Sequence, residues 1–441
     1  MIASQTHWEF GSRRFGSLDN VVIVTRLDVA EASAHMLAGV GTLSLEDVPL
    51  ACALRRVLAR DVISPVTLPP WDNASMDGFA VRTDDVRGAT RDHPVRVRVV
   101  ATVPAGVPAA APMGPGEAVR IMTGAPVPFG TDTVVRIEDT VADGDHITII
   151  DARDAGRNVR LRGEDIQAQQ LVLRAGTVLG APHLGVLAAV GCAMVRVHRR
   201  PRVAILATGD EIVPVERFAE VLSGNRIVSS NSYSLAAAVE LAGGEPMLLR
   251  IAPDDPAMLA TRLRDAEGCD LVITTGGVSV GDFDYTRDVI AAVGGRLSLW
   301  RVRMRPGAPL GFGSVFGVPW LGLPGNPVSA LVTFELFGRP IIRTMIGDVR
   351  PHRRTIRVRT AEALRLAAAL THYLRVTLED VNDGPPLARL TGAQSSGMLT
   401  SLAFADALLV VPPELTEVSS GTALTAIPLG SELAGSVHFP A

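Results

Sequence analysis

The chain has 441 residues, of which 47% are hydrophobic and 20% charged, and its formal net charge is −4 at pH 7. A chain of this length is too long for one hydrophobic core, so we expect about two to four domains. The acidic balance argues against a nucleic-acid-binding surface, and the absence of lysine excludes Schiff-base chemistry, because arginine cannot act as a neutral amine.

Residues 1–25 are expected to form a loose N-terminal extension. Arg13 and Arg14 stand before an apolar patch, as in a twin-arginine export signal. However, Asp19 and Asp28 bracket the patch, which is too short for the apolar region of such a signal. We therefore favour an extension over an export signal.

The next part of the chain predicts an elongated domain with an inserted lobe. Asp28 and Glu31 have the spacing of a capping box at the start of a helix. Residues 26–61 and 151–198 combine helices with strand-like edges, and we expect them to form one elongated N-terminal domain. Residues 62–150 are rich in Pro, Gly, Val and Thr, with β-like runs such as "PVRVRVVATV", and predict a small β-rich lobe.

Residues 199–347 alternate strand and helix patterns. "RVAILAT" and "DLVITT" are continuous apolar runs, typical of strands buried on both faces of a parallel sheet. "SYSLAAAVELAGG" predicts a helix, "PMLLRIA" a strand, and "DDPAMLATRLRDAEG" a helix with Asp254 at its start. This alternation predicts a doubly wound α/β domain.

Residues 348–441 contain short strand patterns separated by turn residues, and they predict a separate all-β domain. The whole chain is thus a multi-domain protein with α/β and β parts. Its cysteines, Cys52, Cys192 and Cys269, are scattered without a CxxC pair. They fit a reducing compartment, which we take to be the cytoplasm, and no apolar run predicts a membrane span.

Polar and glycine-rich loops follow three strands of the predicted α/β domain. They are "TGDE" at residues 208–211, "TTGGVSVGDFD" at 274–284 and "LPGNP" at 323–327. Ligands of open α/β sheets bind beyond the carboxyl ends of the strands. Three such loops at one edge therefore predict a binding site.

The loop at 274–284 has the composition of an anion site. Gly276 and Gly277 remove side chains where a ligand must approach the main chain, and their N–H groups would form a cradle together with the Ser279 hydroxyl. Asp282 and Asp284 would repel a phosphate unless a cation lay between them, which favours Mg²⁺. The alternative is a glycine turn with a capping aspartate.

The remaining loops have weaker signals. Asn326 is placed to cap a helix that begins at Pro327, and this helix start would point N–H groups at an anion; a capped helix without a ligand is the alternative. In the β-rich part, Asp77 and Thr123 stand in loops that alone would be interpreted as polar turns. Asp165 stands in "GRNVRLRGEDI", which alone would be a solvated face of ion pairs.

Together these stretches resemble the molybdopterin molybdenumtransferase family, which includes bacterial MoeA and the E domain of gephyrin. The resemblance runs in family order from about residue 70 to residue 335 and is weakest after residue 350. The matching stretches are "DNASMDGFAVR", "RIMTGAPVPFGTDTVVRIED", "GRNVRLRGEDI", "TGDEIV", "SSNS", "DDP", "TTGGVSVGDFDYTRD", "RPGAPLGFG" and "LGLPGNPVSALVTFE".

The resemblance implies a fold, an assembly and an activity. The fold has an elongated domain with an inserted β-rich lobe, a central molybdopterin-binding α/β domain and a C-terminal β-barrel-like domain. The assembly is a homodimer in which the lobe of one protomer faces the α/β domain of the other, with transient contacts to other proteins of cofactor biosynthesis. The activity takes adenylylated molybdopterin and molybdate, releases AMP and places molybdenum on the pterin dithiolene.

The resemblance also implies site residues. The expected catalytic residues are Asp77, Thr123, Asp165, Glu211, Asp254 and Asp284. The resemblance adds Pro324, Pro327, Arg375 and Ser396 as expected substrate-binding residues. The loops and the basic stretch add Thr208, Gly209, Gly276, Gly277, Ser279, Arg301, Arg305, Gly325 and Asn326. We expect Mg²⁺ near Glu211, Asp254 and Asp284, where it would neutralise phosphate oxygens.

One stretch departs from the family pattern. Where the family often has "WKxxxKPGKP", this chain has "WRVRMRPGAP", so Arg301 and Arg305 keep positive charge and Ala308 loses it. Two other functions stay open: a non-catalytic molybdopterin carrier or scaffold, and a molybdopterin adenylyltransferase. The retained acidic positions favour catalysis, and the additional domains weigh against the adenylyltransferase.

Overall fold

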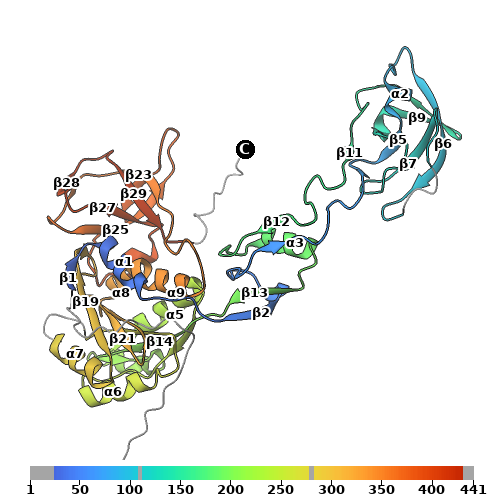
Figure 1. Ribbon diagram of the computed structural model, residues 1–441. Coiled ribbons are helices and arrows are strands. Elements are labelled where there is room, and N and C mark those ends of the chain that lie inside the picture. Colours follow the sequence, from blue (N-terminus) through green and yellow to red (C-terminus); the bar gives the residue numbers. More distant parts are fainter. Residues whose placement is uncertain (1–23, 108–111, 278–282, 431–441) are drawn as a thin grey trace, which may run out of the picture.

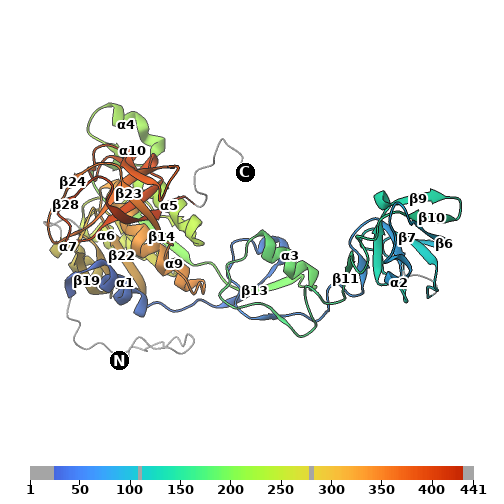
Figure 2. The same cartoon turned by 90° about the horizontal axis from the view of Figure 1, so that it is seen from above.

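The computed structural model describes residues 24–107, 112–277 and 283–430. The described chain is elongated: the α/β and C-terminal domains lie together at one end, a slim domain follows, and the β-rich lobe lies at the far end (Figures 1 and 2). Nearly all of the predicted extension, and Ser279, lie outside the described residues. None of the described helices is both long and apolar enough to cross a membrane.

A seven-stranded sheet forms the centre of the α/β domain, with the order β1-β19-β21-β22-β18-β14-β17. The strands are β1 (Val24–Leu27), β14 (Arg202–Ala207), β17 (Glu245–Leu248), β18 (Leu271–Thr275), β19 (Arg296–Val302), β21 (Gly311–Val315) and β22 (Val318–Leu323). The neighbours β22, β18, β14 and β17 run parallel, whereas β21 is antiparallel to β19 and β22. The predicted strands β14 and β18 are almost wholly buried.

Helices cover both faces of this sheet, which confirms the doubly wound arrangement. One face carries α1 (Val29–Ala38), α5 (Ser230–Ala242), α8 (Pro327–Thr333), a π-helical turn (Phe334–Gly338) and α9 (Arg339–Met345); the other carries α6 (Pro256–Arg264) and α7 (Phe283–Ala292). Residues of β14 alternate between the two cores: Ile205 packs in the α5 core and Leu206 in the α6 core.

The first helix belongs to the α/β domain, although the sequence places residues 26–61 in the elongated domain. Asp28 caps α1 through the predicted capping box with Glu31. The helix buries Ala32 and Met36 in the core of the α/β domain, and β1 pairs in parallel with β19. This pairing joins segments far apart in the chain, so local sequence patterns do not reveal it.

The elongated domain is slim and is held by short strand pairs. β2 (Leu45–Pro49) pairs with β13 (Met194–His198), β3 (Val62–Ile63) pairs with β12 (Leu171–Leu173), and α3 (Ala181–Ala189) packs beside them. Its small core contains Leu58, Leu179, Leu187, Val195 and Val197. The two segments of chain that make up this domain run out to the lobe and back from it (Figure 2).

The lobe is a six-stranded sheet with the order β8-β5-β7-β6-β10-β9, as its β-like sequence runs predict. Its elements are β5 (Gly78–Val81), α2 (Thr83–Val86), β6 (Val95–Val103), β7 (Glu117–Ile121), β8 (Thr133–Arg136), β9 (Thr140–Asp143) and β10 (His146–Ile149). β4 (Asn73–Ala74) and β11 (Val159–Arg160) pair where the chain enters and leaves it.

The C-terminal domain is a closed barrel, which confirms the β-barrel-like expectation. Its strands follow the order β25-β26-β23-β29-β27, and the pairing of β27 with β25 closes the ring. They are β23 (Ile356–Thr360), β25 (Thr371–Glu379), β26 (Leu387–Leu390), β27 (Ala407–Val411) and β29 (Ala423–Pro428), with α10 (Leu399–Ala403) between β26 and β27. β20 (Met304–Arg305) pairs with β25 and joins the barrel to the α/β domain.

Candidate functional site

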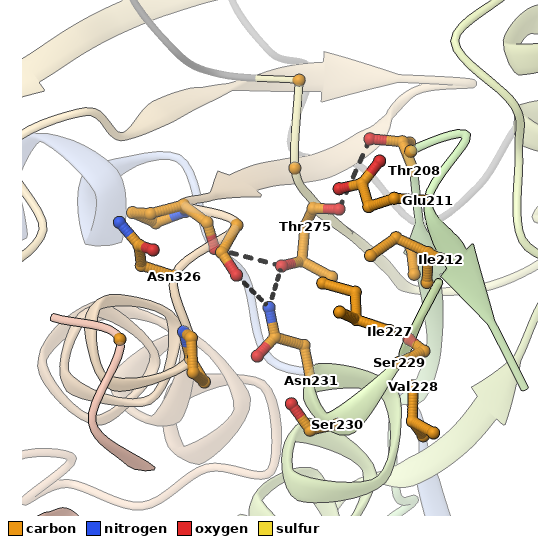
Figure 3. Close-up of a pocket in the computed structure, with 18 of the residues that line it drawn as sticks. Thr208, Glu211, Ile212, Ile227, Val228, Ser229, Ser230, Asn231, Thr275 and Asn326 are labelled. Atoms are coloured by element: carbon orange, nitrogen blue, oxygen red, sulfur yellow. Dashed lines mark hydrogen bonds between the residues drawn. The ribbon is translucent and has the colours of Figure 1, made fainter. Parts of the chain in front are cut away.

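A cavity of about 810 Å³ lies where β14, β18 and β22 end (Figure 3). It occupies the position that open α/β sheets use for ligands. The predicted residues that line it are Thr208, Gly209, Glu211, Asp254, Gly276, Gly277, Pro324, Gly325, Asn326 and Pro327. The three loops chosen from the sequence therefore meet at one cavity, although they are distant in the chain.

Close approach of the loops requires glycine at position 276, while Gly325 lies near it without such a restriction. Gly276 has φ +95°, and a Cβ atom built on it would lie 2.7 Å from the Thr208 carbonyl oxygen. A Cβ atom on Gly325 would lie 3.6 Å from the Gly276 Cα atom. No larger residue fits at position 276 without moving the Thr208 loop.

The helix start at α8 differs from the prediction in one respect. Asn326 occupies the N-cap position and Pro327 is the first helical residue, but the Asn326 side chain makes no capping hydrogen bond. The predicted cap is therefore wrong, and this exposed side chain is left at the cavity. The Val328 N–H donates instead to the Ser396 carbonyl oxygen at 3.1 Å, so the barrel loop reaches the first turn of α8.

Glu211 and Asp254 bring two exposed carboxylates to the cavity wall. The prediction that Asp254 starts α6 is wrong by one residue: Asp255 is the N-cap, and its side chain accepts from the Met258 N–H at 2.8 Å. The backbone N–H of Asp254 donates to the Asp210 carboxylate at 3.1 Å. This bond connects the loop between β17 and α6 to the loop after β14. Asp254 is thus held at the cavity while its neighbour caps the helix.

The expected magnesium site can be tested only in part. The third expected ligand, Asp284, lies in α7, and its side chain falls outside the described residues. Among described residues, no group of three or more His, Cys, Asp or Glu side chains is arranged to hold a metal ion. The carboxylates of Glu211 and Asp254 still fit Mg²⁺, because this ion commonly uses one or two carboxylates and completes its shell with water and phosphate oxygens.

The lobe holds a second group of predicted residues. Asp77 accepts hydrogen bonds from both the N–H and the hydroxyl of Thr123, each at 2.7 Å. The backbone bond first, and then the hydroxyl bond, lower the pKa of the Asp77 carboxyl below its ordinary value. Both residues are exposed, so the structure presents a fixed carboxylate at the lobe surface.

The stretch that contains Asp165 lies next to the Asp77 loop. The Arg162 N–H donates to Asp72 at 2.6 Å, and the Ser75 N–H donates to the Asn158 carbonyl oxygen at 2.9 Å. Asp165 itself is exposed. The stretches that carry Asp77, Thr123 and Asp165 therefore lie side by side where the lobe joins the elongated domain.

Within one chain, the lobe surface and the cavity are far apart. Both views place the lobe at the opposite end of the molecule from β14 and α5, which border the cavity (Figures 1 and 2). A single protomer therefore divides the predicted catalytic residues into two groups that do not meet.

Three predicted arginines do not line the cavity in the described part of the chain. Arg305 is exposed on β20, and Arg301 is half-buried with φ +74°. Arg375 is fully buried, and its guanidinium donates to the Ser401 hydroxyl at 3.1 Å and to the Ser395 carbonyl oxygen at 3.0 Å. The expectation of direct substrate contact by Arg375 is therefore not met in this structure. Arg375 instead holds the barrel loop that contains Ser396, and this loop contacts the start of α8.

The cavity also has a wall that lies outside the three predicted loops. The start of α5 lines it with Ser229, Ser230 and Asn231. The paired strands β15 (Ile212–Val213) and β16 (Ile227–Val228) add Ile212 and Ile227. The signal for the first group was the polar "SSNS" at residues 229–232, which forms the start of α5. The apolar residues gave no signal, because single exposed hydrophobic residues are common on any surface.

Comparison with known proteins adds to this geometry. The chain matches the family descriptions "MoeA N-terminal region (domain I and II)" over residues 27–191, "Probable molybdopterin binding domain" over 204–344 and "MoeA C-terminal region (domain IV)" over 357–429. It is 40% identical over 382 residues to the molybdopterin molybdenumtransferase of a Nostoc species, covering 85% of this chain and 87% of that protein. It is 38% identical over 391 residues to molybdopterin molybdenumtransferase 2 of Mycobacterium tuberculosis, covering 86% and 93%.

Solved structures agree with the sequence relatives. The crystal structure of the molybdopterin biosynthesis moeA protein from Pyrococcus horikoshii OT3 superposes with a TM-score of 0.79 at 28% identity, covering 91% of this chain and all of that one. These matches span every domain described above, and the chain therefore belongs to the MoeA family of molybdopterin molybdenumtransferases.

Proposed function

We propose that this protein inserts molybdenum into adenylylated molybdopterin, using molybdate and releasing AMP. The observation that carries the proposal is the cavity in which glycine-rich loops and two carboxylates meet at the carboxyl end of the sheet. Its glycines keep side chains away from the loops where phosphate would bind, and its carboxylates suit a divalent ion that bridges to phosphate oxygens. Relatives that share all domains of this chain carry the name molybdopterin molybdenumtransferase.

The cavity residues would act on the phosphoanhydride of the substrate. Water would add across the P–O–P bridge: its oxygen bonds to one phosphorus, the bridging oxygen leaves with the other, and AMP, molybdopterin phosphate and a proton result. Negative charge increases on the departing phosphate oxygens. Gly276 places no side chain between these oxygens and its loop, although its own N–H donates to the Leu323 carbonyl oxygen at 3.2 Å, and Glu211 with Asp254 would hold Mg²⁺. The bound ion would neutralise phosphate charge, as is general in phosphoryl chemistry.

The lobe residues would complete the site from a second protomer. Hydrogen bonds from Thr123 fix the Asp77 carboxylate and lower its pKa below the ordinary value, which suits it to orient water or a metal-bound group. The homodimer is supported by exposed apolar side chains on both surfaces that would face each other. Trp71 and Met76 are exposed in the segment that leads to Asp77, while Ile227 lines the cavity and Met398 follows the lining residue Gly397.

The other candidate functions make different predictions for the same reagents. A carrier or scaffold would bind molybdopterin without forming AMP, and an adenylyltransferase would consume ATP without molybdate. We place the activity in the cytoplasm, where scattered, unpaired cysteines are normal.

The direct experiment supplies adenylylated molybdopterin, molybdate and Mg²⁺ to the purified protein and measures AMP. We expect AMP to form only when molybdate is present, and the product to reconstitute an apo molybdoenzyme. Removing Mg²⁺ with a chelator should abolish the release, and adding Mg²⁺ back should restore it. Tight binding of the pterin without AMP would support the carrier instead.

A further inference from the structure

Asn231 joins three elements at the edge of the cavity. It is the second residue of α5, it lines the cavity, and only 8% of it is exposed. Its Nδ2 donates to the Thr275 hydroxyl at the end of β18 and to the Gly325 carbonyl oxygen in the loop before α8, each at 2.8 Å (Figure 3). The Thr275 hydroxyl donates in turn to the Pro324 carbonyl oxygen at 3.1 Å.

The chemistry of the partners fixes the orientation of the Asn231 amide. The Gly325 carbonyl oxygen can only accept, so the amide nitrogen and not the oxygen must face it. The amide oxygen then lies on the other side, where it is buried and has no hydrogen-bond partner among the described residues.

This arrangement contributes little net stability. A buried carbonyl oxygen without a partner is unfavourable, and a residue with an apolar side chain would avoid that penalty. If Asn231 were absent, the exposed Gly325 could turn its carbonyl oxygen to water, and the Thr275 hydroxyl would keep Pro324 as its acceptor. The two bonds of Nδ2 are therefore not explained by a need to hold the fold.

The same two bonds determine how the loops at Gly276 and Gly325 lie against each other at the cavity, where phosphate is proposed to bind. Thr275 directly precedes Gly276, and Gly325 directly precedes Asn326, so Asn231 links the two glycine-bearing loops whose backbones touch. We propose that Asn231 is a positioning residue that sets the distance between the Gly276 loop and the start of α8. This inference rests on the proposed function of the cavity.

The test compares the Asn231→Ala variant with the full-length wild-type protein in the AMP-release assay. Misplacement of catalytic groups by a fraction of an ångström to 1 Å is expected to lower kcat/KM by about 10²-fold. The loss should lie mainly in kcat, because a displaced loop misaligns the phosphoanhydride with the groups that act on it as it breaks. The melting temperature should stay within about 3 °C of the wild type, since removing the unpaired oxygen offsets the lost bonds.

Two further variants make the result specific. Asn231→Asp keeps the size of the side chain but turns a carboxylate oxygen toward the Gly325 carbonyl oxygen, so it should lower kcat at least as much. Ser234→Ala, on the same helix, removes a hydroxyl that bonds only to helix carbonyl oxygens, and it should leave kcat unchanged.

Either of two outcomes would overturn the proposal. One is an Asn231→Ala protein with wild-type kcat. The other is a fall in activity matched by a fall in melting temperature of more than about 6 °C, which would mean that Asn231 only supports the fold. A wild-type protein that forms no AMP would instead refute the proposed function and is distinguishable from both.

Discussion

Replacing Glu211 with Gln is expected to lower molybdate-dependent AMP release by about 10²-fold or more at limiting Mg²⁺ while leaving the protein folded. Glu211 lies at the cavity wall in the loop after β14, and its carboxylate is exposed. Glutamine has the same size and lacks the charge, so it can neither attract nor neutralise a divalent ion equally well.

The Mg²⁺ dependence separates a metal ligand from a general acidic residue. The Glu211→Gln variant should need more Mg²⁺ for half-maximal activity and recover part of its activity at saturating Mg²⁺. Glu240→Gln provides the control, because Glu240 is an exposed glutamate of α5 that is not among the lining residues of the cavity. An unchanged Mg²⁺ dependence in Glu211→Gln would remove this residue from the proposed metal site.

Replacing Gly276 with Ala is expected to damage both stability and activity. The backbone at Gly276 has φ +95°, a conformation that costs an alanine about 1–2 kcal/mol. Its Cβ atom would also lie 2.7 Å from the carbonyl oxygen and from the hydroxyl of Thr208, so the Thr208 loop must move. Overpacking of this kind costs a further 1–3 kcal/mol, roughly, and it closes the cavity where phosphate is proposed to bind.

Gly224 offers a matched control for this substitution. It has the same φ of +95°, and a Cβ atom on it would meet nothing within 4 Å. Gly224→Ala should therefore lose only the backbone part of the stability and keep its activity, as measured by chemical unfolding and AMP release. Equal behaviour of the two alanine variants would show that the contact between Gly276 and Thr208 is unimportant for the cavity.

The sequence was sufficient to locate the cavity because local signals and a general rule combined. Continuous apolar runs predicted β14 and β18, and parallel strands place their following loops at one edge. Gly276 and Gly209 could be selected because each is a glycine in a loop that directly follows a predicted strand. Both have positive φ angles, a conformation that favours glycine. These features depend on residues near one another in the chain.

The cap of α6 was misplaced although a local signal was present: Pro256 favours the first helical position, which makes Asp255 and not Asp254 the N-cap. Features that depend on distant contacts were also misplaced. The prediction assigned α1 to the elongated domain. The residues that share its core, such as Leu235 and Val302, come much later in the chain, so local patterns do not indicate them. Arg375 resembled a ligand-binding residue, yet its burial in the barrel is set by packing of the strands around it.

The assembly proposed for the active site can be tested by subunit mixing. Asp77→Ala damages the lobe surface, and Glu211→Ala damages the cavity, so each variant alone should be inactive. A purified heterodimer of the two, isolated through different affinity tags, combines an intact lobe on one chain with an intact cavity on the other. If sites form between chains, it should recover about half of the wild-type AMP release, because one of its two sites is complete. A heterodimer as inactive as both parents, or a fully active monomer, would contradict a site shared between protomers.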